Sequence, residues 1–319
     1  MFSFTEPTLA PVFTVFGLPV YPYALFMALG AVLALVMALF RAKKTGVKGD
    51  NVLLYAMIAI PLAVICGRIV FCLCRWVDVL DFGFGYILRI DKGGFSVMGG
   101  VAGLALAAVI VRAIRKVSFL DMADTVVPGL LMLLAIARFA EGSTINGTGP
   151  DVMSEALQFM PLARKGLYGE YTYAVHMAEG LTALVAGVYT QAMEKKPRGL
   201  AAGTGAIIAC AAQIVWESAR RDEVLVISFV KYVMVFSALI LLAILLISLH
   251  RLDWPFAGKA LMVGGLFLCA GVVGLNEFFI DGKLIQSIPI WLCYLTDAIA
   301  AGCMGLICLR CLRAACDNV

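Results

Sequence analysis

Long apolar runs without charged residues are the feature that most restricts how this chain of 319 residues can fold. A helix needs roughly 20 apolar residues to cross a bilayer. The runs are continuous rather than alternating, which favours helices over a transmembrane β-barrel. We therefore predict an all-α, polytopic membrane bundle of about nine transmembrane helices. The expected spans are residues 22–40, 52–74, 93–112, 120–140, 174–193, 200–217, 226–249, 258–280 and 287–312.

Composition and charge support this class and suggest an orientation. Hydrophobic residues make up 62% of the chain and charged residues only 14%, which a soluble protein of this length cannot accommodate. Lys and Arg concentrate at the ends of alternate spans, in segments 41–50, 112–116, 195–198, 250–259 and 310–313. The positive-inside rule puts these segments in the cytoplasm, so we expect the N-terminus outside and the C-terminus cytoplasmic. The net charge of +4 follows from this topology and calls for no nucleic-acid partner.

Cysteine and histidine usage gives no reason to expect a metal or an organic cofactor. The chain has ten cysteines and two histidines, and most of the cysteines lie inside predicted helices, where cysteine behaves as a small hydrophobic residue. Cys308 and Cys311 have CxxC spacing, with Cys316 beyond them. Because neither a partner pair nor a histidine lies nearby in the sequence, we interpret these three as structural.

Charged residues inside the apolar runs mark a candidate site, because each costs about 2.5–3.5 kcal/mol on insertion scales. Arg68, Arg138 and Glu217 all fall toward the predicted outer ends of three different helices. Arginine held by glutamate is well suited to binding a phosphate. The structural alternatives are that the arginines reach the headgroup layer and that Glu217 lies at the interface. For Glu179 and Asp297 the alternative is pairing between helices.

Two glycine-rich segments adjoin these charges. The glycines of 92-KGGFSVMGGVAG-103 either allow close helix packing or expose amides to an anion. Those of 134-LAIARFAEGSTINGTGP-150 interrupt the helix just after Arg138. Irregular backbone at membrane depth is tolerated only where it is buried or lines a wet cavity. We therefore predict a cavity at the outer leaflet that holds a phospholipid headgroup.

In its order of motifs and its topology, the segment 10–248 resembles the bacterial prolipoprotein diacylglyceryl transferase family. That family has seven helices and begins outside. The matching positions are Tyr23 in 21-YPYALFMALG-30, Gly67 and Arg68 in 65-ICGRIVF-71, Gly94, Ser96 and Gly99 in 93-GGFSVMGG-100, Arg138 and Gly149 in 138-RFAEGSTINGTG-149, and finally Glu179, Glu217 and Arg220.

Several positions depart from the family pattern. The histidine of the family's Gly-Gly-x-Ser-x-His motif is Met98 here, and its second arginine is Gln213. The tyrosine expected four residues before that arginine is Ala209. Within the signature, Glu141 replaces the first asparagine and Asn146 replaces the glutamate.

The resemblance implies transfer of a diacylglyceryl group from phosphatidylglycerol to the lipobox cysteine of a prolipoprotein. It implies the bacterial cytoplasmic (inner) membrane, an active cavity facing the outer leaflet, and no cofactor or metal. The expected partners are phosphatidylglycerol and the prolipoprotein signal segment. Among catalytic residues, we expect Arg138 to clamp the phosphate and Glu217 to orient an arginine. Because Met98 cannot take a proton, Glu141 is the expected base. The expected substrate-binding residues are Arg68, Arg138, Arg220, Tyr23, Asn146, Gly149, Gly94, Ser96 and Gly99.

Residues 1–250 are expected to form the transferase-like seven-helix domain. Residues 251–319 would add two helices and a short cytoplasmic tail. Two other functions stay open. An inactive relative would bind phospholipid or lipoprotein signal segments without chemistry, as the changes at Met98 and Gln213 suggest. A secondary transporter would use Asp297 or Glu179 to carry ions, although the halves show no internal repeat.

Overall fold

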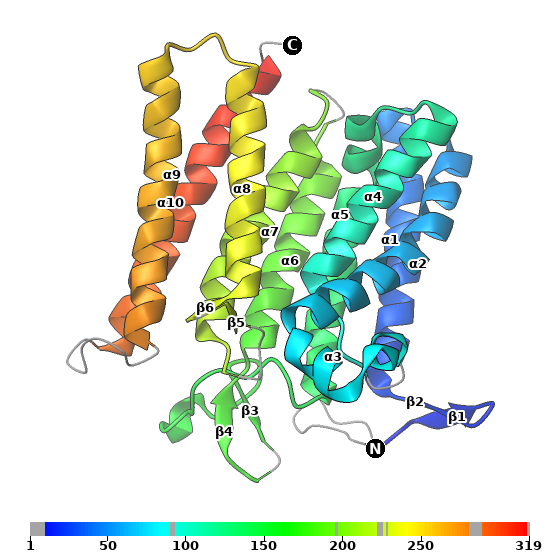
Figure 1. Ribbon diagram of the computed structural model, residues 1–319, viewed down its shortest axis with the longest axis vertical. Coiled ribbons are helices and arrows are strands. Elements are labelled where there is room, and N and C mark those ends of the chain that lie inside the picture. The colour runs from blue at the N-terminus through cyan, green and yellow to red at the C-terminus, as the bar shows by residue number, and fades with distance from the viewer. Residues whose placement is uncertain are drawn as a thin grey trace.

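The computed structural model describes residues 10–89, 93–166, 168–194, 197–221, 226–227, 229–280 and 289–317. Within these ranges, nine helices of 18 or more residues run side by side along the long axis of the molecule (Figure 1). They are α1 (Pro22–Thr45), α2 (Gly49–Cys74), α4 (Val97–Arg115), α5 (Phe119–Ala140), α6 (Val175–Ala192), α7 (Leu200–Ala219), α8 (Tyr232–His250), α9 (Phe256–Ile280) and α10 (Ile290–Asp317).

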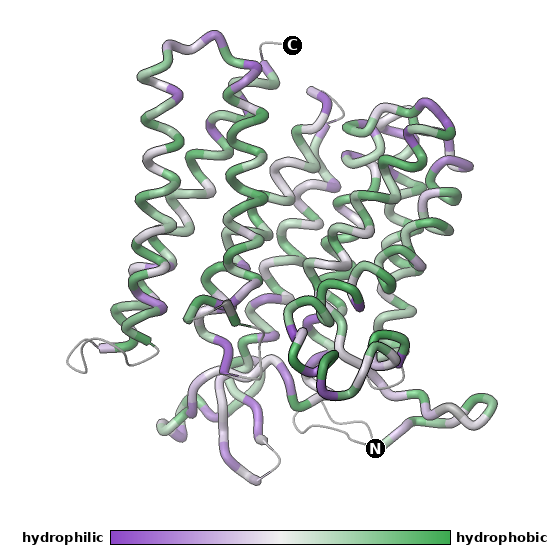
Figure 2. The backbone as a smooth tube through the Cα atoms, viewed as in Figure 1, coloured by the Kyte–Doolittle hydropathy of each residue, from purple (hydrophilic) through white to green (hydrophobic). Residues whose placement is uncertain are grey.

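Eight of these nine helices are long and apolar enough to cross a membrane. The remaining helix is α6, which forms as expected but has only 18 residues and carries His176 and Glu179. Figure 2 shows apolar residues along the helices and polar residues gathered toward the two ends of the bundle. The prediction of an all-α, multi-pass membrane bundle is confirmed, whereas the direction in which its ends face stays a prediction.

The short elements of the described chain gather at one end of the bundle, which we call the hairpin end (Figure 1). Three antiparallel hairpins lie there, formed by β1 (Phe13–Val15) with β2 (Leu18–Val20), β3 (Ala163–Lys165) with β4 (Tyr171–Tyr173), and β5 (Val226–Ile227) with β6 (Val230–Lys231). The short helix α3 (Trp76–Phe82) and the 3-10 turns η1 (Phe84–Leu88), η3 (Glu141–Ser143) and η4 (Glu155–Leu157) belong to the same end.

Small residues set the close approach of the first helices. α1 packs against α5, and α2 packs against α4. A Cβ added at Gly129 on α5 would lie 2.5 Å from the carbonyl oxygen of Ala34 on α1, and one at Gly99 on α4 would lie 2.5 Å from that of Cys66 on α2. Such contacts allow helix backbones to approach where lipid offers no hydrophobic driving force between helices. Buried residues of these four helices form one hydrophobic cluster, which includes Val52 and Val111.

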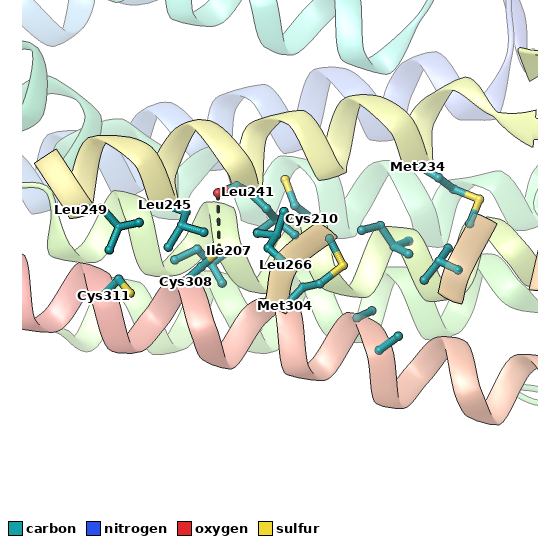
Figure 3. Close-up of a cluster of buried hydrophobic side chains, with 14 of the residues drawn as sticks. Ile207, Cys210, Met234, Leu241, Leu245, Leu249, Leu266, Met304, Cys308 and Cys311 are labelled. Carbon is teal, nitrogen blue, oxygen red and sulfur yellow. Dashed lines mark hydrogen bonds between the residues drawn. The ribbon is translucent and has the colours of Figure 1, made fainter. Parts of the chain in front are cut away.

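A second hydrophobic cluster joins the last four helices (Figure 3). Leu241 of α8 and Met304 of α10 meet Ile207 of α7 in its interior. Cys308 and Cys311 are fully buried in this cluster, as their structural interpretation requires. Helices α9 and α10 thus share a core with α7 and α8. The division of the chain into two parts at residue 250 stays a prediction.

Two predicted helix starts are shifted for local reasons. Helix α4 begins at Val97 rather than at residue 93, because Gly93 and Gly94 have φ angles of 72° and 77°, outside the helical region. Ser96 then caps the helix by accepting the N–H of Gly99 at 3.0 Å. Helix α8 begins at Tyr232 rather than at residue 226, because the β5–β6 hairpin precedes it.

Candidate active site

Five buried charged residues meet at the hairpin end, and we call them the charge cluster. Arg138 lies in the last turn of α5, and Glu141 follows at once in η3. Glu179 comes from α6, Glu217 lies in the last turn of α7, and Arg220 caps that helix. Every one of the five is at most 9% exposed. Of the three residues expected to converge, Arg138 and Glu217 lie in this cluster, whereas Arg68 is bound to other groups.

Ion pairs link two arginines and two glutamates of the charge cluster in a closed ring. Nη1 of Arg138 lies 2.5 Å from Oε1 of Glu141, and its Nε lies 3.3 Å from Oε2 of Glu179. Nη1 of Arg220 lies 3.0 Å from Oε2 of Glu179 and 3.3 Å from Oε2 of Glu141. Each arginine therefore contacts both carboxylates. This pairing offsets the desolvation that buried charges would otherwise suffer.

Gln213 bridges the carboxylates where the family pattern has an arginine. Its Nε2 donates to Oε1 of Glu179 and to Oε2 of Glu217, both at 2.9 Å. An amide nitrogen has two hydrogens and can satisfy both acceptors, but it brings no positive charge. Lys231 supplies a cation close by, since its Nζ donates to the carbonyl oxygens of Glu217 at 2.5 Å and of Arg220 at 2.7 Å. These carbonyls end α7, where a cation is favoured by the helix dipole.

The loop 141–149 begins with Glu141 of the charge cluster and is held at its far end by backbone hydrogen bonds. The Gly149 N–H donates to the carbonyl of Tyr173 on β4 at 2.8 Å. The carbonyl of Thr148 accepts from the Arg221 N–H at 2.8 Å, just beyond α7. Asn146 is exposed, and its backbone N–H bonds to Thr144 Oγ1 at 3.1 Å. The exposed side chain of Asn146 is thus accessible to a substrate.

Tyr23 also belongs to these surroundings. It lies in the first turn of α1, a helix that packs against α5 and contacts η3. The start of α1 therefore lies at the hairpin end, as the charge cluster does (Figure 1). This placement agrees with its predicted substrate-binding role, which stays a prediction.

Arg68 is held elsewhere at the hairpin end. Its guanidinium donates to the carbonyl oxygens of Tyr86 and Gly93, both at 2.6 Å, to that of Gly94 at 3.0 Å and to that of Ile87 at 3.2 Å. It is 3% exposed. These contacts connect α2 to η1 and to the two glycines that precede α4, and they do not join Arg68 to the charge cluster. Its predicted part in phosphate binding stays a prediction.

The segment at the start of α4 is closely packed against neighbouring elements. It contains three of the predicted binding residues, namely Gly94, Ser96 and Gly99. Ser96 Oγ lies 2.8 Å from the hydroxyl of Tyr232, which connects the start of α4 to the start of α8. A Cβ at Gly94 would lie 2.6 Å from the ring of Phe71. This segment therefore forms a tightly packed wall at the hairpin end, and its predicted contact with substrate stays a prediction.

Two residues near the cluster were not assigned to the site from the sequence. Arg164 on β3 is 2% exposed and donates from Nη1 to the carbonyl of Glu141 at 3.1 Å. His176, at the start of α6, is fully buried, and its Nδ1 lies 3.0 Å from the carbonyl oxygen of Gly147. A signal existed for His176, because the chain has only two histidines and this one closely precedes Glu179. Arg164 lies between two predicted helices, in a segment for which the sequence predicted no secondary structure.

A separate buried polar group lies between α7, α9 and α10. Ser218 Oγ lies 2.5 Å from Oε1 of Glu277 and 3.1 Å from Oδ2 of Asp297. Asn276 Nδ2 donates to Oδ1 of Asp297 at 2.8 Å and to Oγ1 of Thr296 at 2.7 Å. Asp297 thus binds neighbouring helices, as its structural alternative expected. These contacts join the last two helices to the turn of α7 that also carries Glu217.

The charge cluster combines two arginines with three glutamates, so an anionic oxygen ligand can bind its arginines only in place of a carboxylate. Within the described parts of the chain, Nε2 of His176 is buried without a hydrogen-bond partner. Nε of Arg138 and Oε2 of Glu141 also make no hydrogen bond, but each lies 3.3 Å from its ion-pair partner. A phosphate oxygen can accept from guanidinium groups in place of a carboxylate. In the same parts of the chain, no group of three or more His, Cys, Asp or Glu has the arrangement of a metal site.

Comparison with known proteins agrees with this geometry. The family model for prolipoprotein diacylglyceryl transferase matches residues 11–250. A phosphatidylglycerol–prolipoprotein diacylglyceryl transferase of Clostridioides difficile is 38% identical over 135 residues, which are 42% of this chain and 53% of that relative. The chain thus matches about half the length of this relative. The protein of the same name from Bacillus velezensis is 28% identical over 244 residues, 74% of this chain and 89% of the relative. Since the family model covers more than half of the chain, this protein belongs to the prolipoprotein diacylglyceryl transferase family.

Proposed function

We propose that this protein transfers the diacylglyceryl group of phosphatidylglycerol to the lipobox cysteine of prolipoproteins. The observation that supports it best is the ion-pair ring of Arg138 and Arg220 with Glu141 and Glu179, buried at the hairpin end. Relatives in Clostridioides difficile and Bacillus velezensis carry the name of this activity. The site has the cations that a phospholipid headgroup needs, at one end of a membrane bundle.

The reaction requires a held phosphate and an attacking thiolate. The cysteine sulfur displaces glycerol phosphate from the glycerol carbon of the lipid, and negative charge grows on the departing phosphate. Positive groups fixed in place before the reaction stabilise such charge most effectively. Arg138 and Arg220 meet this requirement, because Glu141 and Glu179 hold both guanidiniums in position. We assign Arg220 the part of the second arginine, which Gln213 cannot take.

The other predicted residues divide into two groups. Tyr23 lies at the hairpin end, Asn146 and Gly149 lie on the loop 141–149, and these residues would contact the headgroup or the signal segment. Arg68 and the segment 93–99 would form the wall beside it. In this proposal the hairpin end faces the outer leaflet of the bacterial inner membrane. Lipid then enters from the bilayer, and glycerol phosphate leaves outward.

The last two helices are proposed to support the site rather than to build it. The family match ends at residue 250, before α9 begins at Phe256. Glu277 and Asp297 nevertheless contact Ser218, which directly follows Glu217 in the sequence. We infer that α9 and α10 brace the end of α7 and thereby the position of Arg220.

One alternative has a specific observation in its favour. Met98 and Gln213 stand where the family has a histidine and an arginine, as expected for a relative that binds phospholipid or signal segments without chemistry. Expression in bacteria depleted of their own transferase separates the two functions. Growth with mature lipoproteins, lost on Arg138→Ala, supports the enzyme. Membrane insertion without lipoprotein modification, together with modification gained on Met98→His, supports the inactive relative.

A further inference from the structure

The imidazole of His176 is a buried group whose chemistry the proposed function has not yet used. Its side chain is fully buried, and its Nδ1 lies 3.0 Å from the carbonyl oxygen of Gly147. A carbonyl only accepts hydrogen bonds, so Nδ1 must carry the hydrogen. The lone pair of the neutral ring is then on Nε2. Nε2 is buried without a hydrogen-bond partner among the described residues.

Gly147 places this imidazole beside the charge cluster. A Cβ added at Gly147 would lie 2.6 Å from Cβ of His176 and 2.8 Å from Oε2 of Glu141. His176 and Glu141 thus flank the same glycine, whose φ of 79° is one that side-chain-bearing residues rarely adopt. His176 therefore lies next to Glu141, the glutamate that pairs with both arginines of the charge cluster.

Two carboxylates of the cluster, Glu141 and Glu179, are poorly placed to accept a proton. Glu141 contacts Arg138 through one oxygen and Arg220 through the other, so protonating it would disrupt both ion pairs. Glu179 is held by Arg138, Arg220 and Gln213. Accepting a proton there would likewise remove the charge that fixes the arginines. We assign Glu141 to holding the arginines, although the sequence suggested it as the base.

We propose that His176 is the general base of the transfer, an assignment that rests on the proposed function. Nε2 takes the proton from the lipobox thiol, and the sulfur forms a C–S bond with the glycerol carbon of the lipid. The C–O bond to phosphate breaks, and its electron pair leaves on the phosphate oxygen of glycerol phosphate. Arg138 and Arg220 hold that phosphate, and the imidazolium returns its proton to it or to water. His176 thereby supplies the proton acceptor that Met98 cannot.

Two amide variants separate the base from a loop-holding role. Asn at position 176 places an amide nitrogen near Nδ1 and keeps a donor for the Gly147 carbonyl, whereas Gln places its amide near Nε2. Neither amide accepts a proton. Purified protein is assayed with vesicles of labelled phosphatidylglycerol and a lipobox peptide. We expect both His176→Asn and His176→Gln to lower kcat by about 10²–10⁴-fold, with little change in KM for the lipid. Near-normal kcat in His176→Asn would overturn the assignment.

The second histidine provides a matched control. His250 is exposed at the last turn of α8, at the end of the bundle opposite the hairpin end. We expect His250→Asn to keep wild-type kcat. This variant also leaves a single imidazole in the chain, so ¹⁵N-histidine NMR reports on His176 alone. We expect a neutral ring protonated at Nδ1, and a ring protonated at Nε2 instead would overturn the assignment even if position 176 tolerates no substitution.

The outcomes distinguish this inference from the function on which it rests. A wild-type protein that transfers no label in the purified assay refutes the proposed function, and the base assignment with it. An active wild type whose His176→Asn variant is equally active refutes the base assignment alone. An active wild type that loses kcat in both amide variants, with unchanged thermal unfolding and a control that stays active, is the result we expect.

Discussion

Nη1 of Arg220 lies 3.0 Å from Oε2 of Glu179, so a buried ion pair ties the end of α7 to the beginning of α6. The same carboxylate oxygen lies 3.3 Å from Nε of Arg138 on α5. One glutamate therefore sets the position of two arginines from different helices. This pairing accounts for a buried carboxylate on α6.

Removing the charge of Glu179 is predicted to destabilise the fold and to lower transfer. Glu179→Gln leaves Arg138 and Arg220 facing each other with Glu141 as their remaining partner in the ring. Breaking a buried pair from one side costs about 3–5 kcal/mol. Thermal unfolding in detergent micelles measures the loss. Glu194→Gln, at an exposed position beyond α6, is the control. Equal unfolding temperatures for the two variants would contradict the buried-pair interpretation.

Replacing Arg138 with lysine is predicted to reduce transfer although the charge is kept. The guanidinium contacts Glu141 and Glu179 through different nitrogens, and a lysine ammonium lacks this planar fork. We expect kcat to fall by about 10²–10³-fold, the usual effect of removing one preorganised donor. Arg198→Lys is the control, because Arg198 pairs with Asp121 at an exposed position. A fall of similar size in both variants would argue against a specific clamp.

Gly147 is predicted to tolerate no side chain. Its φ of 79° strains any other residue, and a Cβ would lie 2.6 Å from Cβ of His176. Gly147→Ala should therefore displace the loop 141–149 and lower both stability and transfer. Gly271→Ala is the matched control on α9, where an added Cβ would have no atom within 4 Å. We expect this control to keep transfer and to gain slightly in stability, because alanine favours a helix.

The sequence predicted that Arg68, Arg138 and Glu217 converge, because the lengths of membrane helices determine the depth of each residue; this is correct for Arg138 and Glu217. Depth does not determine direction, however, and Arg68 shows the difference. It lies toward the predicted outer end of its helix, yet its guanidinium binds the carbonyls of Tyr86, Ile87, Gly93 and Gly94. The sequence did not predict these contacts, because residues 93 and 94 were expected to begin a helix.

His176 is the opposite case, because it lies beside the site although the sequence did not assign it there. Its importance depends on the contact with Gly147, which lies 29 positions away in the chain and becomes a neighbour only after the loop 141–149 folds onto α6. The same reasoning applies to Gln213, which stands where the family resemblance implies an arginine. In the structure its amide joins Glu179 to Glu217 and so has a bridging role of its own.

The pair Glu277 and Asp297 is predicted to hold one proton. Both carboxyl groups contact the hydroxyl of Ser218, which has a single hydrogen and can donate to only one of them. The other contact is a hydrogen bond only if a carboxyl group donates. Glu277→Gln retains a donor and should keep the unfolding temperature within a few degrees, whereas Glu277→Ala should lower it clearly. Equal destabilisation by both variants would show that the pair does not share a proton in this way.

The central claim is that Arg138 and Arg220 together hold the phosphate of a phospholipid while its diacylglyceryl group is transferred. The most direct measurement uses purified protein, vesicles containing phosphatidylglycerol labelled in the diacylglyceryl part, and a peptide with a lipobox cysteine. We predict that the label appears on the peptide thiol, that glycerol phosphate is released in equal amount, and that Arg138→Ala and Arg220→Ala each abolish both. Transfer that persists in both variants, or a wild-type protein that releases no glycerol phosphate, would contradict the account.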